Sequence, residues 1–359
     1  MKRIIVIIIA LWIAMPSTAQ VRGKIDIPNL NGFVTLKCDF HMHTVFSDGN
    51  VWPTVRVAEA YREGLDAISI TDHIEYRPHA EDIKADHNRS YNIAAPAARS
   101  AGIILIKGSE ITRAMPPGHH NALFLTDSDE LDQKDYMDAF RAAQKQNAFL
   151  FWNHPGWDAQ QPDTTLWFSE HTKLLEQGLM MGMEVVNGNE YFPEAHQWCL
   201  EKKLTMLGTS DVHDPIQAQY DFANGAHRTV TLVFAKEATA LGIREALDNR
   251  RTAVYNGDDL IGEEVYLKEL FENALDIKME KTSNAVRITI KNNSDLKFNL
   301  RKTKHDARLV YFRSYTIVPQ GTHVITVRLQ EGVTGGDMNF CVENLLVLPN
   351  KGMNYTLKI

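Results

Sequence analysis

The 359-residue sequence is poor in cysteine, has no excess of positive charge and contains no internal repeat. Its three cysteines are far apart and form no Cys-x-x-Cys pair, which argues against a disulfide framework. The formal net charge of −7 offers no basic surface to DNA or RNA, so we expect no nucleic-acid partner. The content of 44% apolar and 23% charged residues is ordinary for a globular protein, and the length allows two domains.

The first residues are typical of a secretory signal peptide. Lys2-Arg3 gives a positive start, residues 4–15 are apolar, and Ser17 and Ala19 occupy the small-residue positions of a cleavage site. The apolar run is short for a membrane span, and the alternatives are a buried strand or an uncleaved anchor. We predict a bacterial signal peptide over residues 1–19, a periplasmic or secreted protein, and no membrane span after removal of the signal.

Apolar runs alternate with amphipathic helical patterns between residues 33 and 249. Near-continuous apolar strands that alternate with helices favour an α/β fold with a parallel sheet covered on both faces. Seven such units predict a closed (β/α)7 barrel. A doubly wound open sheet is the alternative, but no Gly-rich phosphate loop follows the first strand. The predicted strands are Phe33–Phe40, Ala67–Thr71, Ile103–Ser109, Ala148–Trp152, Gly182–Val186, Leu204–Gly208 and Thr229–Phe234. The predicted helices are Trp52–Glu63, Ser90–Ala101, Lys134–Gln146, Leu166–Gln177, Pro193–Lys202 and Thr239–Asn249.

Polar side chains follow the predicted strands at their carboxyl ends. Residues i and i+2 of a strand face the same side, so His41 and His43 present two imidazoles to one point. A barrel brings the carboxyl ends of all its strands to one mouth, where its active site lies. Each ending alone has a simpler explanation, such as a helix N-cap, but together they predict a metal cluster for Zn, Mn or Fe. The endings are His41 and His43, Thr71-Asp72-His73, Ser109-Glu110, Asn153-His154, Asn187-Gly188-Asn189-Glu190 and Asp211-Val212-His213.

The pattern changes after Asn249. We predict a linker helix within residues 257–274 and a small all-β, sandwich-like domain over residues 275–359, in which short alternating runs are separated by turn residues. This part contains only two histidines and no cluster of ligand residues. Packing against the barrel, dimerisation and carbohydrate binding remain open as its role.

The motifs together resemble the polymerase and histidinol phosphatase (PHP) family of metal-dependent phosphoesterases, in a secreted bacterial form with a C-terminal β domain. The resemblance covers roughly residues 35–249, and the family fold is a distorted seven-stranded barrel. It depends on Asp39-Phe40-His41-Met42-His43-Thr44, Ser47-Asp48-Gly49, Gly64-Leu65-Asp66-Ala67-Ile68-Ser69-Ile70-Thr71-Asp72-His73, Glu110, His119, His154 and Asp211-Val212-His213.

The resemblance implies three divalent metal ions and nine ligand residues. The first ion would be bound by His41, His43, Glu110 and Asp211. Glu110 would bridge to a second ion, bound also by His119 and His154. The third would be bound by Asp48, His73 and His213. Adjacent residues in a strand face opposite ways, so only one of His119 and His120 should be a ligand. The motif favours His119.

The predicted reaction is hydrolysis of small phosphate esters by a metal-bound hydroxide. We assign catalytic roles to Glu110, Asp211 and His213. Arg77 is assigned a contact with the phosphate, because a guanidinium can form two hydrogen bonds to it. Arg113 is a second candidate for this contact and Arg228 a weaker one. Trp157 is expected in the pocket wall and Trp152 in the core. We expect no catalytic role for His79, His87, His171, His196 or His227.

Two other functions remain open at this point. An amidohydrolase also begins a barrel with His-x-His, but it would need a bridging lysine on a middle strand, where this sequence has Glu110 and His154. The other alternative is a protein that binds metal or glycan without turnover. The sequence leaves open the substrate, the choice between monoester and diester, the metal and the oligomeric state.

Overall fold

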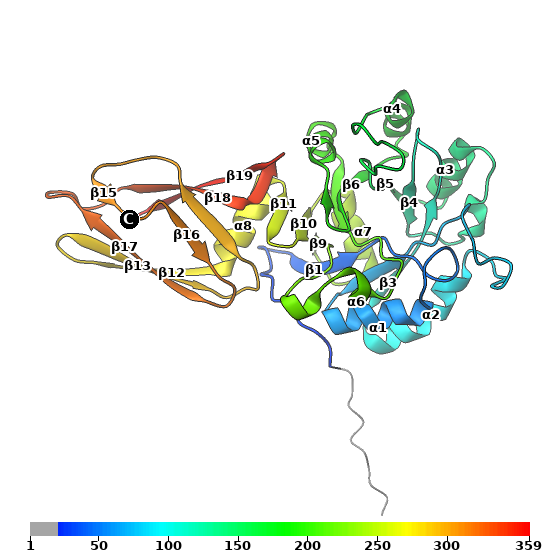
Figure 1. The fold of residues 1–359 in the computed structure, drawn as a ribbon, viewed down its shortest axis with the longest axis horizontal. Coiled ribbons are helices and arrows are strands. Elements are labelled where there is room, and N and C mark those ends of the chain that lie inside the picture. Colours follow the sequence, from blue (N-terminus) through cyan, green and yellow to red (C-terminus); the bar gives the residue numbers. More distant parts are fainter. Residues whose placement is uncertain (1–20) are drawn as a thin grey trace, which may run out of the picture.

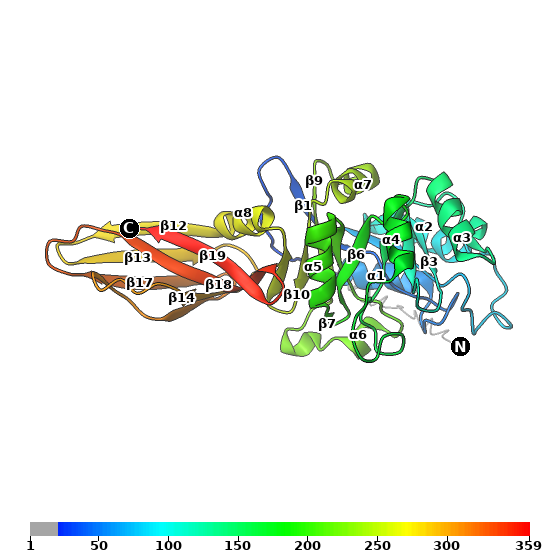
Figure 2. The same ribbon diagram turned by 90° about the horizontal axis from the view of Figure 1, so that it is seen from above.

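The structure is a computed structural model that describes residues 21–359. The predicted signal peptide therefore lies outside the described residues. Within them, no helix combines the length and the apolar character needed to cross a membrane. The molecule is elongated, with an α/β domain at one end and an all-β domain at the other (Figure 1, Figure 2).

The α/β domain contains the seven strands that the sequence predicts. They are β1 (Val34–Asp39), β2 (Ala67–Ile70), β3 (Ile104–Ile111), β5 (Phe149–Trp152), β6 (Gly182–Asn187), β8 (Thr205–Thr209) and β9 (Val230–Ala235). Four further strands are not predicted from the sequence, namely β4 (His120–Leu123), β7 (Glu190–Tyr191), β10 (Thr252–Asn256) and β11 (Asp259–Gly262). Strands β2, β5, β8 and β9 are buried along their whole length, as expected when both faces of a sheet are covered.

The sheet is mixed, so the prediction of a parallel sheet holds only for part of it, including the pairs β1–β2, β2–β3, β5–β6 and β6–β8. Strand β9 pairs antiparallel with β1 and with β10, and β4 pairs antiparallel with both β3 and β5. Strand β4 returns directly alongside β3 because the loop between them, which contains Pro116-Pro117-Gly118, has no room for a crossover helix. The order of strands in this part is β10, β9, β1, β2, β3, β4, β5, β6 and β8.

The hydrogen-bonded ladders of residues 21–359 do not close into a barrel, so the closed (β/α)7 barrel is not confirmed. No ladder joins β8 to β9 within this range. The Thr231 side chain bridges them instead, since its Oγ1 accepts from the Gly208 amide at 3.0 Å and donates to the Gly208 carbonyl at 2.8 Å. A side chain thus replaces the backbone ladder at this point.

The six predicted helices of this domain lie within three residues of their predicted positions, and the short helix α6 is not predicted from the sequence. Helices α1 and α2 end at Gly64 and Gly102, whose φ angles of +80° and +67° favour glycine and cap the helix ends. The helices of this domain are α1 (Pro53–Glu63), α2 (Arg89–Ala101), α3 (Tyr136–Lys145), α4 (Ser169–Glu176), α5 (Pro193–Lys202), α6 (Ile216–Gln219) and α7 (Ala240–Asp248).

The C-terminal part consists of two sheets that pack face to face. One contains β12 (Leu275–Lys281), β13 (Ala285–Asn292), β17 (Thr322–Leu329) and β15 (Leu309–Val310); the other contains β16 (Ser314–Ile317), β14 (Phe298–Lys302), β18 (Asp337–Leu348) and β19 (Lys351–Lys358). Alternate residues of β13, including Ile288 and Ile290, are buried and meet Phe298 and Phe340 of the opposite sheet in one core.

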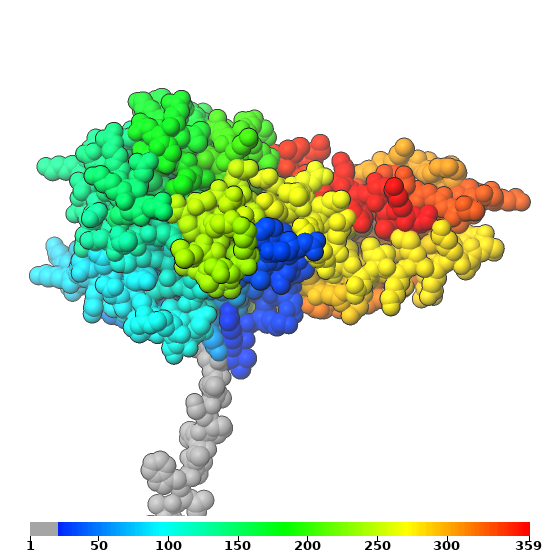
Figure 3. Space-filling view, turned by 180° about the vertical axis from the view of Figure 1, so that it is seen from behind, coloured from blue at the N-terminus to red at the C-terminus, as the bar shows by residue number. Residues whose placement is uncertain are grey.

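The two parts are joined by a shared sheet. Strand β18 pairs in parallel with β11, with Leu260 opposite Leu345. The interval 257–274, predicted as a linker helix, therefore contains a sheet strand before helix α8 (Glu264–Ala274). The N-terminal segment also spans the junction, where the Asp26 amide donates to Asp295 Oδ2 at 2.7 Å. Figure 3 shows this segment, in dark blue, against the junction.

Candidate metal centre

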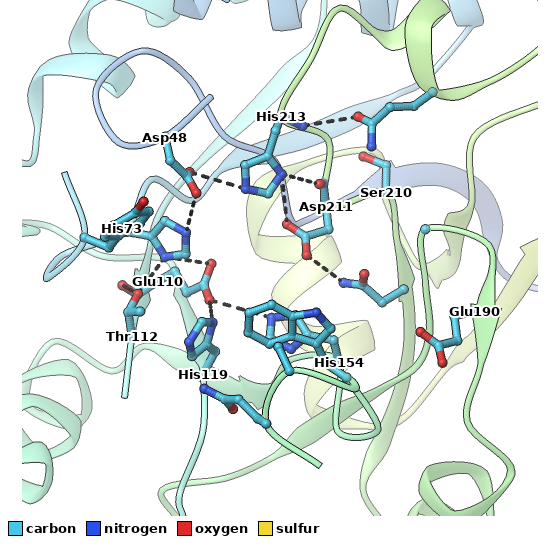
Figure 4. A pocket seen from close by; sticks show the side chains of 17 residues that line it. Asp48, His73, Glu110, Thr112, His119, His154, Glu190, Ser210, Asp211 and His213 are labelled. Atoms are coloured by element: carbon cyan, nitrogen blue, oxygen red, sulfur yellow. Dashed lines mark hydrogen bonds and ion pairs between the residues drawn. The ribbon is translucent and has the colours of Figure 1, made fainter. Parts of the chain in front are cut away.

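A cavity of about 650 Å³ opens where the strands of the α/β domain end (Figure 4). Polar side chains from most of the predicted strand endings line it. Short bridges between Met42 and Val212 and between His73 and Glu110 bring these endings side by side. The lining residues are Asp48, His73, Tyr76, Glu110, Thr112, His119, His154, Trp157, Ala159, Gln160, Asn187, Gly188, Glu190, Ser210, Asp211, His213 and Gln219.

Two ligand candidates have an unusual backbone conformation. His154 has a φ angle of +29° and Asp211 one of +50°. Positive φ is uncommon for residues other than glycine and is concentrated at functional sites. In both cases the strand ends abruptly and the side chain lines the cavity.

Four donor atoms form a tight cluster beneath the cavity. They are Nε2 of His41, Nε2 of His43, Oε2 of Glu110 and Oδ1 of Asp211, and five of their six separations lie between 3.0 and 3.2 Å. A regular tetrahedron with such edges has its centre about 1.9 Å from each corner, close to the Zn–N and Zn–O distances of about 2.0 Å. The atoms are thus spaced as the ligands of one tetrahedral cation.

The carboxylate oxygens at this centre face histidine nitrogens, as expected for a cation site. Asp211 Oδ1 and Glu110 Oε1 are buried and accept no hydrogen bond of acceptable geometry, although histidine nitrogens lie 3.1 and 2.7 Å away. Burial opposes charge on His41, yet the negative charges of Asp211, Glu184 and Glu110 hold its pKa well above the usual value. Burial also opposes charge on His43, but hydrogen bonds to Asp211 and Glu110 raise its pKa to about 9. The carboxylates therefore require positive charge between them, which a divalent cation supplies.

A second donor group lies on the other oxygen of Glu110. His119 Nδ1 is 2.7 Å from Glu110 Oε1, and His154 Nε2 is 3.9 Å from the same oxygen. His120 instead faces the core, where its ring packs against Phe140. Burial holds the pKa of His120 well below its usual value. The geometry therefore agrees with the preference for His119 over His120.

A third donor group lies at the rim of the cavity. Asp48 Oδ2 is 3.4 Å from His73 Nε2, and Asp48 Oδ1 is 3.3 Å from His213 Nε2. Burial opposes charge on Asp48, but hydrogen bonds from His213 and His73 hold its pKa well below the usual value. His43 also lies within reach of this group, and His73 lies within reach of Glu110 and His119, so the donor sets overlap.

Comparisons with known proteins identify the family. The structure of a two-domain protein from Bacteroides vulgatus, containing a predicted PHP-like metal-dependent phosphoesterase, is 58% identical to this chain. It aligns over 95% of this chain and 100% of its own, with a TM-score of 0.94. The chain belongs to the PHP-like metal-dependent phosphoesterase family. A family model described as an Ig-like domain matches residues 273–358 of this PHP-like protein, and no curated protein matches the chain.

Two remote similarities concern about half of the PHP-like protein and support no argument about function. A predicted metal-dependent phosphoesterase from Bifidobacterium adolescentis is 17% identical, covers 49% of this chain and 87% of its own, and has a TM-score of 0.40. An amidohydrolase from Chromobacterium violaceum is 16% identical, covers 50% of this chain and 88% of its own, and has a TM-score of 0.38.

Glu184 is a residue of the PHP-like centre that the sequence analysis missed. Its Oε1 accepts from His41 Nδ1 at 2.8 Å and from Thr209 Oγ1 at 2.6 Å. Its Oε2 accepts from the His154 amide at 2.7 Å and from Asn187 Nδ2 at 2.8 Å. The proton thus sits on His41 Nδ1 and leaves the Nε2 lone pair for a metal. A lone glutamate inside the apolar run of β6 is the sequence signal that could have revealed it.

Arg56 is a second missed residue, and it holds two ligand loops together. This fully buried guanidinium on α1 donates to the carbonyls of His43, Val212, His213 and Asp214 at 2.7–3.0 Å. It also pairs with buried Glu59 at 2.8 Å, so its charge is compensated. Nothing in an isolated helix pattern distinguishes such an arginine from a solvated one.

The arginines predicted to bind phosphate do not line the cavity. Arg77 donates to the carbonyls of Ala85 at 2.7 Å and Phe46 at 3.3 Å, which contradicts its assignment as a catalytic contact. The guanidinium is taken up by one free carbonyl of its own loop, that of Ala85, and by one of the loop after β1, that of Phe46. Arg113 pairs with Glu75 at 2.7 Å and also lies outside the cavity lining. Arg228 is buried below the centre with Asp39 and Glu63.

The remaining aromatic predictions agree with the structure. Trp157 lines the cavity, whereas Trp152 is fully buried in the core. Asp39 forms a salt bridge to Arg228 at 3.0 Å. His79, His87, His171, His196 and His227 do not line the cavity, and the expectation that they have no catalytic role stays a prediction.

Proposed function

We propose that this PHP-like protein hydrolyses small phosphate esters with the help of three divalent ions of Zn, Mn or Fe. The single observation that carries the proposal is the convergence of nine donor residues, with Glu110 among them in a central position. One of its oxygens lies in the tetrahedral cluster, and the other lies 2.7 Å from His119 Nδ1. A carboxylate that faces two donor groups is suited to bridging two cations.

The residues fit the three ions as follows. His41, His43, Glu110 and Asp211 would bind the first; Glu110, His119 and His154 the second; and Asp48, His73 and His213 the third. When bound, such ions neutralise a phosphate and supply a deprotonated water as nucleophile near neutral pH. In the overall reaction, water replaces the alcohol on phosphorus, and the alcohol leaves with a proton.

Two protein side chains orient histidine ligands of the proposed metal centre. Glu184 and Thr112 bind the Nδ1 atoms of His41 and His73 at 2.8 and 2.6 Å, which leaves the Nε2 atoms free for metal. Among the described lining residues there is no lysine or arginine, so the charge of the phosphate has to be balanced by the metal ions. The proposal therefore predicts strict metal dependence.

The test is turnover by reconstituted protein. Purified protein is loaded with Mn or Zn, its metal content is measured by elemental analysis, and p-nitrophenyl phosphate and bis(p-nitrophenyl) phosphate are assayed. We expect hydrolysis of at least one ester, abolished by a chelator and reduced at least about a hundredfold in Glu110→Gln. Glu194→Gln, on the exposed side of α5, is the control and should retain activity. Loaded protein that hydrolyses neither ester contradicts the proposal.

The two other functions make different predictions. An amidohydrolase of the type considered above requires a lysine at the centre, and the described cavity lining contains none. A protein that binds metal without turnover would retain the ions in elemental analysis and hydrolyse neither ester. The assay therefore separates this alternative from the phosphoesterase.

We also propose that the protein is secreted or periplasmic in its bacterial host. The support is the sequence pattern of residues 1–19. Fractionation of the native host, with N-terminal sequencing of the mature protein, tests this proposal. A full-length N-terminus in the cytoplasmic fraction would contradict it.

A further inference from the structure

The cavity has an outer half that contains none of the proposed metal ligands. Three of its residues carry side-chain amides, one carries a carboxylate and two are exposed aromatics. Its floor is the metal centre, so a bound ester would place its alcohol part against these side chains. The residues are Tyr76, Trp157, Gln160, Asn187, Glu190 and Gln219.

The charge of this outer half is negative. Glu190 lines the cavity and has no ion pair or side-chain hydrogen bond within residues 21–359. Figure 4 shows it beyond His154, on the side away from His73. Burial and the nearby charge of Asp158 raise the pKa of Glu190, so two acidic groups lie near each other here. With Arg77 and Arg113 turned away, an anionic alcohol would meet uncompensated negative charge.

The aromatic wall lies next to the metal donors. The Trp157 ring lies 5.2 Å from the His154 ring and 5.6 Å from the His119 ring, between centroids, and 41% of Trp157 is exposed. An exposed indole packs well against the C–H face of a ring that also carries polar groups. A cavity of about 650 Å³ holds a ligand of the size of a phosphorylated monosaccharide.

On the basis of the proposed phosphoesterase function, we infer that the substrates are phosphomonoesters of uncharged, hydroxyl-rich alcohols, such as sugars. Trp157 packs against the alcohol, and Glu190 together with the amides of Gln160 and Gln219 binds its hydroxyl groups. Glu190 also repels alcohols that carry a negative charge. A site built to bind hydroxyl groups discriminates strongly against analogues without them, because its polar groups are then left unpaired.

The test compares matched esters on the Mn-loaded protein. Glucose 6-phosphate and 6-phosphogluconate share a six-carbon skeleton, but in the second C1 is oxidised to a carboxylate and the chain is open. n-Hexyl phosphate has the carbon chain without the hydroxyl groups. We expect kcat/KM for glucose 6-phosphate to exceed that for either of the others at least about tenfold. In Glu190→Gln, the preference over 6-phosphogluconate should fall about tenfold, whereas Glu194→Gln should leave it within about twofold.

The outcomes separate this inference from the proposed function. Hydrolysis of p-nitrophenyl phosphate with equal or better use of 6-phosphogluconate or n-hexyl phosphate overturns the inference alone. An unchanged preference in Glu190→Gln also overturns the role of Glu190. Failure to hydrolyse any of the four esters, with metal bound, overturns the phosphoesterase function and the inference with it.

Discussion

The substitution Glu184→Gln tests whether the buried carboxylate on β6 prepares the metal centre. The change keeps the size of the side chain, removes its charge and turns one acceptor oxygen into an NH2 group. Glu184 accepts four hydrogen bonds, two on each oxygen. Whichever way the glutamine amide is oriented, its NH2 group faces two donors. Either the contact with His41 Nδ1 or the contact with the His154 amide is therefore lost.

The expected loss is in metal affinity. Replacing a group that orients a metal ligand costs about 10- to 100-fold in affinity, or about 1.4–2.7 kcal/mol. We expect the upper half of this range, because the glutamine also removes a negative charge that raises the pKa of His41. Stability of the metal-free protein is a poor readout. The lost hydrogen bonds destabilise the metal-free protein, but removal of the negative charge of Glu184 relieves its repulsion from the carboxylates of Glu110 and Asp211.

The assay is a competition titration of the metal-free protein with Zn or Mn against a chromophoric chelator. Glu245→Gln is the matched control, since Glu245 pairs with Arg251 on the surface and does not line the cavity. The control should keep the affinity of the unaltered protein. If Glu184→Gln bound metal as tightly as the control, the role assigned to Glu184 would be wrong.

Three further predictions concern protons, an arginine and the N-terminus. Because the pKa of His43 is raised to about 9, the metal-free protein holds this proton at pH 7.5. Metal binding should then release at least one proton. The apparent metal affinity should rise about tenfold per pH unit for each released proton, up to pH 9. Calorimetry in buffers of different ionisation enthalpy counts the released protons. Arg77→Ala should lower the melting temperature while kcat stays within about threefold, because Arg77 binds backbone carbonyls and not substrate. A hundredfold loss of kcat would support the sequence prediction that Arg77 contacts the phosphate. Mature protein from its host should begin at Gln20, and an intact Met1 would refute the cleavage site.

The ligands could be predicted because their positions follow from local rules. Residues after buried strands meet at one edge of a sheet, so His41, Glu110, His154 and Asp211 could be placed together from sequence order alone. The i, i+2 relation added His43 to the same point. These rules do not require a closed barrel, which is why the site is predicted better than the topology. The insertion of antiparallel β4 leaves the ends of β3 and β5 on the same side.

The groups around the ligands could not be predicted, because they depend on contacts between distant segments. Glu184 lies 143 residues from His41, and Arg56 lies more than 150 residues from the Val212 and His213 carbonyls that it binds. Arg77 shows the opposite error. Its place after β2 suggested the cavity, but the carbonyls of Ala85 in its own loop and of Phe46 in the loop after β1 bind the guanidinium. Chain position gives proximity to a site and not the direction of a long side chain.

The shared sheet agrees with packing against the α/β domain, one of the three roles that the sequence left open for the C-terminal domain. Within the described residues, the cavity is lined by residues 48–219, and none comes from the β domain. Yet β18 covers β11, whose Leu260 and Ile261 are almost fully buried. Without that pairing, β11 would be an apolar edge strand with free backbone groups, a site for aggregation. Two strands away from β11, β9 pairs with β1, which ends just before His41. The β domain therefore covers one edge of the sheet, and β1, which precedes the first metal ligands, lies in the interior of that same sheet.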